Sequence, residues 1–322
     1  MEENKERDVQ NGQIVVKKRC RSLLCDVLAG ACIGVAFIIP GFSGGSVAAI
    51  LGIYEKLVCA IANIFKETKK SIVTLLPIGI GLVLGAMALM FPLGFFLDRF
   101  PLPTVSLFVG LAIGGLPNVI ENVKGKPKGA EIASLSVALL FAAMLSFIPV
   151  GSDVNLFGIG FGGYVLLFLV GMVGSCALVV PGISGSMLLL ILGYYNPIVS
   201  LITDHLLRFD NVLGCILVLG SCGLGIAVGF LLISILMKNL LARYPRHTYY
   251  AIIGFIVGSI PTVYVSTMKS AGMLTHSLEL VSAPSSVAYY VLCIFLVMMG
   301  TCASYNFASL MSKKSDGDTS EE

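Results

Sequence analysis

Apolar stretches separated by short polar ones fill almost the whole chain. In the first half, an apolar stretch at residues 22–54 is interrupted near its middle, and continuous stretches follow at 71–97, 101–120 and 132–150. The second half repeats this order, with one interrupted stretch and three continuous ones, at 164–202, 212–237, 248–268 and about 281–310. Because a helix that crosses a membrane needs about 20 apolar residues, the pattern predicts an all-α polytopic membrane protein.

The two interruptions have nearly the same sequence. The first reads Pro40-Gly41-Phe42-Ser43-Gly44-Gly45-Ser46, and the second reads Pro181-Gly182-Ile183-Ser184-Gly185-Ser186. Pro and Gly stop a helix, since Pro lacks an amide donor and Gly tolerates positive φ, whereas Ser is a natural N-cap that begins a new helix. Each interrupted stretch is therefore expected to form a helix, a break and a second helix. The candidate substrate-binding residues at the breaks are Pro40, Gly41, Ser43, Gly44, Gly45, Ser46, Pro181, Gly182, Ser184, Gly185 and Ser186.

The similarity extends beyond the breaks and indicates an internal duplication. Identical residues recur at an offset of 141 near the breaks, as in Tyr54 and Tyr195, and at an offset of 144 farther along, as in Arg99 and Arg243. Glycines four residues apart also recur in both halves, and small residues at this spacing let helices pack closely in lipid. We expect equivalent helices to contact each other in the two halves through the pairs Gly30/Gly34, Gly81/Gly85, Gly110/Gly114, Gly225/Gly229 and Gly254/Gly258.

The distribution of Lys and Arg predicts the orientation of the chain. If each interrupted stretch is a re-entrant hairpin and the N-terminus is cytoplasmic, 18 of the 21 basic residues lie inside, with Arg99, Arg208 and Lys269 outside. If each interrupted stretch crosses once, the division becomes 12 to 9, which the positive-inside rule disfavours. Two short helices that both cross would give the same count as the hairpin, so charge leaves that arrangement open.

We therefore predict two inverted-topology repeats, each a re-entrant helical hairpin plus three transmembrane helices, with both termini in the cytoplasm. The first repeat covers 22–150, with its hairpin at 22–54, and the second covers 164–311, with its hairpin at 164–202. An external loop at 151–163 joins the repeats, and polar cytoplasmic tails occupy 1–21 and 312–322.

The composition agrees with a membrane protein and limits the classes of partner that we expect. Charged residues make up 12% of the chain, about half of the roughly 25% found in soluble domains, and mean hydropathy is +0.94. The net charge of +3 is too small to favour a nucleic-acid partner. The nine cysteines lack the close spacing of zinc sites, so we expect neither a metal nor a cofactor, and membrane lipids are the expected surroundings.

The repeated breaks point to a transport site. Interrupted apolar segments in corresponding positions of two inverted halves indicate the substrate site of a secondary transporter. Inverted symmetry would bring the two breaks together near the midplane, where Ser hydroxyls and the amides of a new helix favour an anion. Physical chemistry therefore predicts an anionic substrate and alternating access. A tight turn in a buried hairpin, with the serines acting as caps, would explain one break as well, but two matched copies favour the site.

A few charged residues are further candidates. Arg99 and Arg243 occupy equivalent positions after the continuous stretches, at predicted opposite membrane faces, and each could bind a phosphate there; snorkelling at a helix end would explain them equally. Asp26 and Glu55 are candidates for coupling to protons or another ion, although either could simply face cytoplasmic water.

The two break sequences and the duplicated glycine-rich helices between them resemble a bacterial family of polyprenyl-phosphate transporters, formerly a domain of unknown function. The resemblance covers residues 20–310. It implies a bacterial plasma-membrane protein that moves undecaprenyl phosphate, the carrier lipid of envelope synthesis, from the outer to the cytoplasmic leaflet. In this sequence Ser186 stands where the first copy has a second Gly.

Two other classes remain to be compared with this reading. A secondary transporter of a small soluble anion or ion-coupled solute would use the same architecture. A membrane enzyme, such as a lipid phosphatase, needs a nucleophile or a metal set, yet His205, His247 and His276 have no acidic motif beside them. We therefore expect no enzymatic activity. A channel is disfavoured because the sequence has no charge rings.

Overall fold

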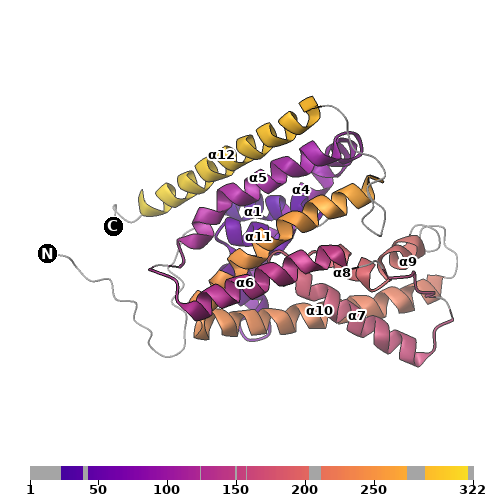
Figure 1. The fold of residues 1–322 in the computed structure, drawn as a ribbon. Coiled ribbons are helices and arrows are strands. Elements are labelled where there is room, and N and C mark those ends of the chain that lie inside the picture. Colours follow the sequence, from indigo (N-terminus) through magenta and orange to yellow (C-terminus); the bar gives the residue numbers. More distant parts are fainter. Residues whose placement is uncertain are drawn as a thin grey trace.

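A computed structural model describes residues 23–38, 43–123, 125–148, 151–156, 158–202, 212–273 and 287–317. Every regular element in these ranges is a helix (Figure 1). The predicted tail at 1–21 and the break residues Pro40 and Gly41 lie outside the described residues, as does the side chain of Ser186.

The two halves contain the same succession of helices. The first half comprises α1 (Leu23–Ile38), α2 (Gly44–Ile50), α3 (Tyr54–Ala62), α4 (Thr68–Arg99), α5 (Pro101–Ile120) and α6 (Gly129–Met144), with a short 3-10 turn at Leu145–Phe147. The second comprises α7 (Phe161–Val179), α8 (Gly185–Ile191), α9 (Tyr195–Ser200), α10 (Val212–Arg243), α11 (Pro245–Ser270) and α12 (Val287–Gly317). Pro at the first position of α5 and α11 suits a helix start, because the missing amide has no intrahelical acceptor there.

The structure shifts several predicted boundaries. Each segment after a break is divided into two short helices at a glycine in a left-handed conformation, Gly52 with φ 67° and Gly193 with φ 77°. The sequence predicts a first interrupted stretch that ends at residue 54, so α3 lies beyond it, whereas the second stretch, which ends at 202, contains both α8 and α9. A single Gly within an apolar run is a weak signal against a continuous helix. The joining loop lies a few residues earlier than predicted, because the helical part of the first half ends at Phe147 and α7 begins at Phe161. At the other end, α12 continues to Gly317, into the predicted tail at 312–322.

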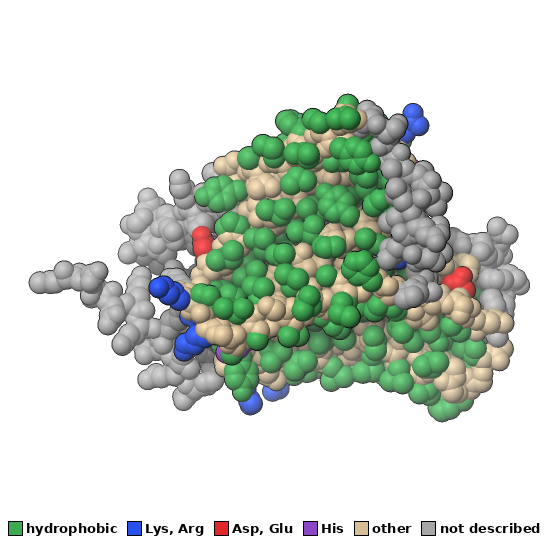
Figure 2. All heavy atoms as spheres, in the orientation of Figure 1, with side chains coloured by type: hydrophobic (Ala, Val, Ile, Leu, Met, Phe, Trp, Pro, Cys, Tyr) green, Lys and Arg blue, Asp and Glu red, His purple; other side chains and the backbone are tan. Residues whose placement is uncertain are grey.

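Six of the described helices are long and apolar enough to cross a membrane, which makes the chain a multi-pass membrane protein. They are α4, α5, α7, α10, α11 and the Val287–Asn306 part of α12. The apolar helices α1 and α6 are shorter. Hydrophobic side chains are spread over much of the face shown in Figure 2, as expected for a surface that lies against lipid rather than water.

Glycines set the four closest helix contacts, as the sequence predicted. In the first half Gly30 and Gly34 of α1 lie against the backbone of α4, and in the second half Gly171 of α7 lies against the backbone of α10. A Cβ atom at these positions would collide with the neighbouring carbonyl group. Close backbone approach of this kind replaces the hydrophobic effect as the source of helix association in lipid.

The other two contacts join the halves to each other. Helix α5 packs on α12 through Gly110 and Gly114, and α6 packs on α11 through Gly254 and Gly258 (Figure 1). Thus the last helix of each half packs on the fifth helix of the other half. This exchange gives the two halves the same set of neighbours.

Candidate functional site

The two sequence breaks lie against each other. Gly45 approaches the carbonyl of Val179 and the ring of Pro181 so closely that a side chain at position 45 would not fit. Ser46, which is 2% exposed, accepts a hydrogen bond of 2.7 Å from the backbone amide of Gly182. The pairing of the breaks, predicted from their symmetric positions in the sequence, is therefore present in the folded chain.

The first serine of each break begins a helix but does not cap it with its side chain. Ser43 and Ser184 occupy the N-cap positions of α2 and α8 with extended backbone angles, and neither side chain bonds to an amide of its own helix. The Ser43 hydroxyl instead donates across the break to the carbonyls of Ala177 and Val180, at 3.4 and 3.5 Å. These bonds are long for a hydroxyl donor, so the group is weakly held.

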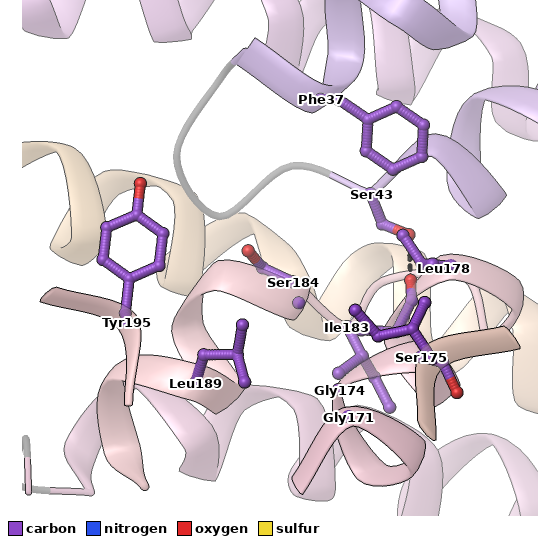
Figure 3. Close-up of a pocket in the computed structure, with 13 residues that line it drawn as sticks. Phe37, Ser43, Gly171, Gly174, Ser175, Leu178, Ile183, Ser184, Leu189 and Tyr195 are labelled. Carbon is purple, nitrogen blue, oxygen red and sulfur yellow. Dashed lines mark hydrogen bonds between the residues drawn. The ribbon is translucent and has the colours of Figure 1, made fainter. Parts of the chain in front are cut away.

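A cavity of about 220 Å³ opens where the breaks meet (Figure 3). It is bounded mainly by α7 and α8, with Phe37 and Ser43 added from the first half. Its polar side chains all carry hydroxyl groups, namely Ser43, Ser175, Ser184 and Tyr195. The other described lining residues are apolar or glycine, and none of the described lining residues is charged.

Some of the lining residues were not singled out from the sequence as site candidates. Ser175 lies one helix before the second break, and its hydroxyl donates to the carbonyl of Met172 in its own helix at 2.6 Å. Phe37 lies near the end of α1, just before the first break, and nothing in the sequence distinguishes it there from other apolar residues. Tyr195 did carry a usable signal, because it matches Tyr54 in the repeat.

The predicted arginines lie apart from this cavity. Arg99 and Arg243 end α4 and α10, are exposed, and do not belong to the cavity lining. Another arginine, Arg246, makes the strong contact at this end of α11: its guanidinium binds both carboxylate oxygens of Glu131 at 2.6 and 2.9 Å. A two-point Arg–carboxylate pair fixes geometry as well as charge, and here it joins the starts of α6 and α11.

The two acidic candidates are also held by the protein, away from the cavity. Asp26 is 6% exposed and binds the ammonium of Lys56 at 2.6 Å through one carboxylate oxygen, while its other oxygen has no partner among the described residues. The idea that Asp26 simply faces water is therefore wrong. Glu55 accepts a hydrogen bond of 2.6 Å from the hydroxyl of Tyr249 in α11.

Comparisons with known proteins point to one family. The family described as VCA0040-like, undecaprenyl phosphate translocase-like, matches residues 33–281. A polyprenyl-phosphate transporter of Staphylococcus aureus (strain NCTC 8325 / PS 47) is 30% identical over 268 residues, which cover 74% of this chain and 85% of the relative. No solved structure matches the chain significantly.

Proposed function

The chain belongs to the undecaprenyl phosphate translocase-like family, and on this premise we propose that it carries undecaprenyl phosphate from the outer to the cytoplasmic leaflet of a bacterial plasma membrane. The observation that carries the proposal is the cavity at the paired breaks, where Ser43 and Ser184 both reach the lining. A cavity lined by serine hydroxyls from both halves of a duplicated membrane protein is suited to a small polar group that both halves must hold in turn.

The volume of the cavity suits the phosphate head of the lipid but not its tail. At about 220 Å³, the space is below the range of roughly 300–1,000 Å³ that encloses drug-sized ligands. It has room for a phosphate but not for a long polyprenyl chain. The tail stays in the bilayer, against the exposed apolar side chains of helices such as α4 and α12. Only the phosphate, which hydrocarbon excludes, needs a path through the protein.

The chemistry of the lining suits transient binding of an anion. Hydroxyl groups of Ser43, Ser184 and Tyr195 can donate hydrogen bonds to phosphate oxygens, whereas a lining Lys or Arg would hold a phosphate far more tightly. A carrier must release its substrate on the far side, so hydroxyl donors in an apolar surround are a suitable compromise. Arg99 and Arg243, exposed at the ends of α4 and α10, would collect the phosphate at the two membrane faces.

Translocation would proceed by alternating access between two inverted repeats. The α1–α4 and α7–α10 pairs are equivalent units, and the bond between Gly182 and Ser46 joins the breaks in the present arrangement. Rocking of the repeats would open this contact and expose the site to the other face. The half-buried Asp26–Lys56 pair lies in the first half, and Glu55 of the first half accepts its bond from Tyr249 of the second half. These are the places where a proton or another coupling ion would act.

The test is translocation of labelled undecaprenyl phosphate in liposomes that contain the purified protein, with and without a pH gradient. The Ser43→Ala/Ser184→Ala variant is compared with a matched control, Ser134→Ala/Ser221→Ala, whose exposed hydroxyls bond only to their own helices. We expect translocation by the wild type and the control, and a loss of roughly tenfold or more in the site variant, since each lost hydrogen bond to a charged group costs about 1.5–3 kcal/mol.

The other outcomes show which part of the proposed function is wrong. Equal translocation by all three proteins would move the head-group site away from the breaks, toward Arg99 and Arg243. A wild type that takes up free phosphate but leaves the lipid in place would make the protein a carrier of small soluble anions.

A further inference from the structure

Tyr54 and Tyr195 occupy the same place in the two halves. Each is the first residue of a short helix, α3 or α9, two positions after a glycine with positive φ. The backbone bonds before them are also the same: the amide of Ile53 donates to Ala48 and that of Tyr194 donates to Leu189, each at 2.9 Å. The local backbone therefore places the two tyrosines in equivalent positions.

The surroundings of the two side chains nevertheless differ. Tyr195 is 37% exposed and lines the cavity beside Ser184 (Figure 3). Tyr54 is 3% exposed within the largest apolar core, and its hydroxyl has no hydrogen-bond partner among the described residues. Because the local backbone is the same, this difference comes from the way the rest of the molecule packs around each helix.

The space that corresponds to the cavity is filled in the first half. Ile33, which stands where the second half has Gly174, packs with Phe37 against Gly44. In the second half the equivalent glycine, Gly185, has looser neighbours. Opening the first-half space therefore requires α2 and α3 to move away from α1.

A buried phenol without a partner is an unexpected choice for this position. A hydroxyl that leaves water without finding a hydrogen bond is destabilising, and Phe would fill the same space without that cost. A tyrosine here is explained if its hydroxyl finds a partner in a second arrangement of the protein. The matched residue indicates where that partner would lie, because Tyr195 lines the cavity in the present arrangement.

We propose that Tyr54 binds the phosphate head group in the opposite conformation of the transport cycle, the role that Tyr195 would have in the conformation seen here. This inference rests on the proposed function and adds Tyr54 to its head-group ligands, as the counterpart of Tyr195. In each conformation one tyrosine lines the open cavity and donates its phenolic proton to a phosphate oxygen in a hydrogen bond. Its counterpart is enclosed in the core with its hydroxyl unsatisfied.

The experiment compares Tyr54→Phe and Tyr195→Phe with a control, Tyr305→Phe, whose side chain is exposed on α12. Translocation of labelled undecaprenyl phosphate is measured in liposomes, and thermal unfolding is measured in detergent. We expect each site variant to slow translocation by on the order of tenfold to a hundredfold, as for a lost hydrogen bond to a charged group. Tyr54→Phe should melt at the same temperature as the wild type or above it, and the control should match the wild type in both measurements.

The combination of the two measurements separates a transport role from a structural one. Tyr54→Phe with normal translocation would overturn the proposal, and so would slow translocation together with a lower melting temperature, which would mean that the hydroxyl supports the fold. Normal translocation by Tyr195→Phe would overturn the pairing of the two residues. A wild type that moves no lipid would instead overturn the proposed function itself.

Discussion

The hydrogen bond between the two breaks can be tested by removing the hydroxyl of Ser46. This hydroxyl accepts the amide proton of Gly182 at 2.7 Å, and both residues are buried. In Ser46→Ala the amide loses its acceptor, and the tight space around Gly45 and Pro181 leaves little room for a water to replace it. The bond belongs to the contact between the halves, so its loss acts on how they fit together rather than on one helix.

The magnitude follows from the burial of the orphaned group. A buried amide without a partner costs about 1–3 kcal/mol, which lowers the melting temperature by several degrees in a chain larger than about 150 residues. The matched control is Ser221→Ala, a half-buried residue whose hydroxyl makes a solvent-exposed bond to the carbonyl of Leu217 one turn earlier. A substitution of that kind should change the free energy of unfolding by no more than about 0.5 kcal/mol.

The assay is thermal unfolding of the purified variants in detergent, followed by translocation in liposomes. We expect Ser46→Ala to unfold at a lower temperature than both the wild type and Ser221→Ala. If the bond closes one conformation, the same variant should also change the translocation rate, because 1–3 kcal/mol shifts a two-state equilibrium by roughly 5- to 150-fold. Unfolding of Ser46→Ala at the same temperature as Ser221→Ala would refute the reasoning.

Two further changes test the packing and the buried ion pair. Gly81→Ala should reduce the yield of folded protein, because its Cβ would meet the backbone of Val27, whereas Gly79→Ala on the same helix has open space and should be neutral or slightly stabilising; equal yields on size-exclusion chromatography would contradict the close contact. Lys56→Met should destabilise the protein by about 1–3 kcal/mol, because it leaves the buried Asp26 carboxylate without its cation, although Lys56 itself is half-buried. Adding Asp26→Asn should recover most of that loss in a thermal melt, and a double variant no more stable than Lys56→Met would argue against a coupled pair.

Several features of the fold could be predicted because they depend on residues close in sequence. The long apolar runs predicted the membrane helices, and α5 begins and ends where its run does. Glycines four residues apart marked the faces where helices touch. The repeated break sequences predicted that the two breaks belong together, and Ser43, Ser184 and Gly185 do line one cavity. The water-facing alternative for Asp26 was wrong, because its burial and its pairing with Lys56, which is distant in sequence, leave no mark in the local sequence.

Other features were decided by tertiary structure alone. Helices such as α4 and α10 are apolar on all sides, so periodicity does not indicate which partner each face will meet. The exchange of α6 and α12 between the halves therefore became visible only in the folded chain. The same holds for the two tyrosines. Their sequences and local backbones predict equal roles, but non-local packing encloses Tyr54 and leaves Tyr195 in the cavity. The repeat in the sequence predicts two matched halves, whereas contacts between residues far apart in the chain set how the two halves differ.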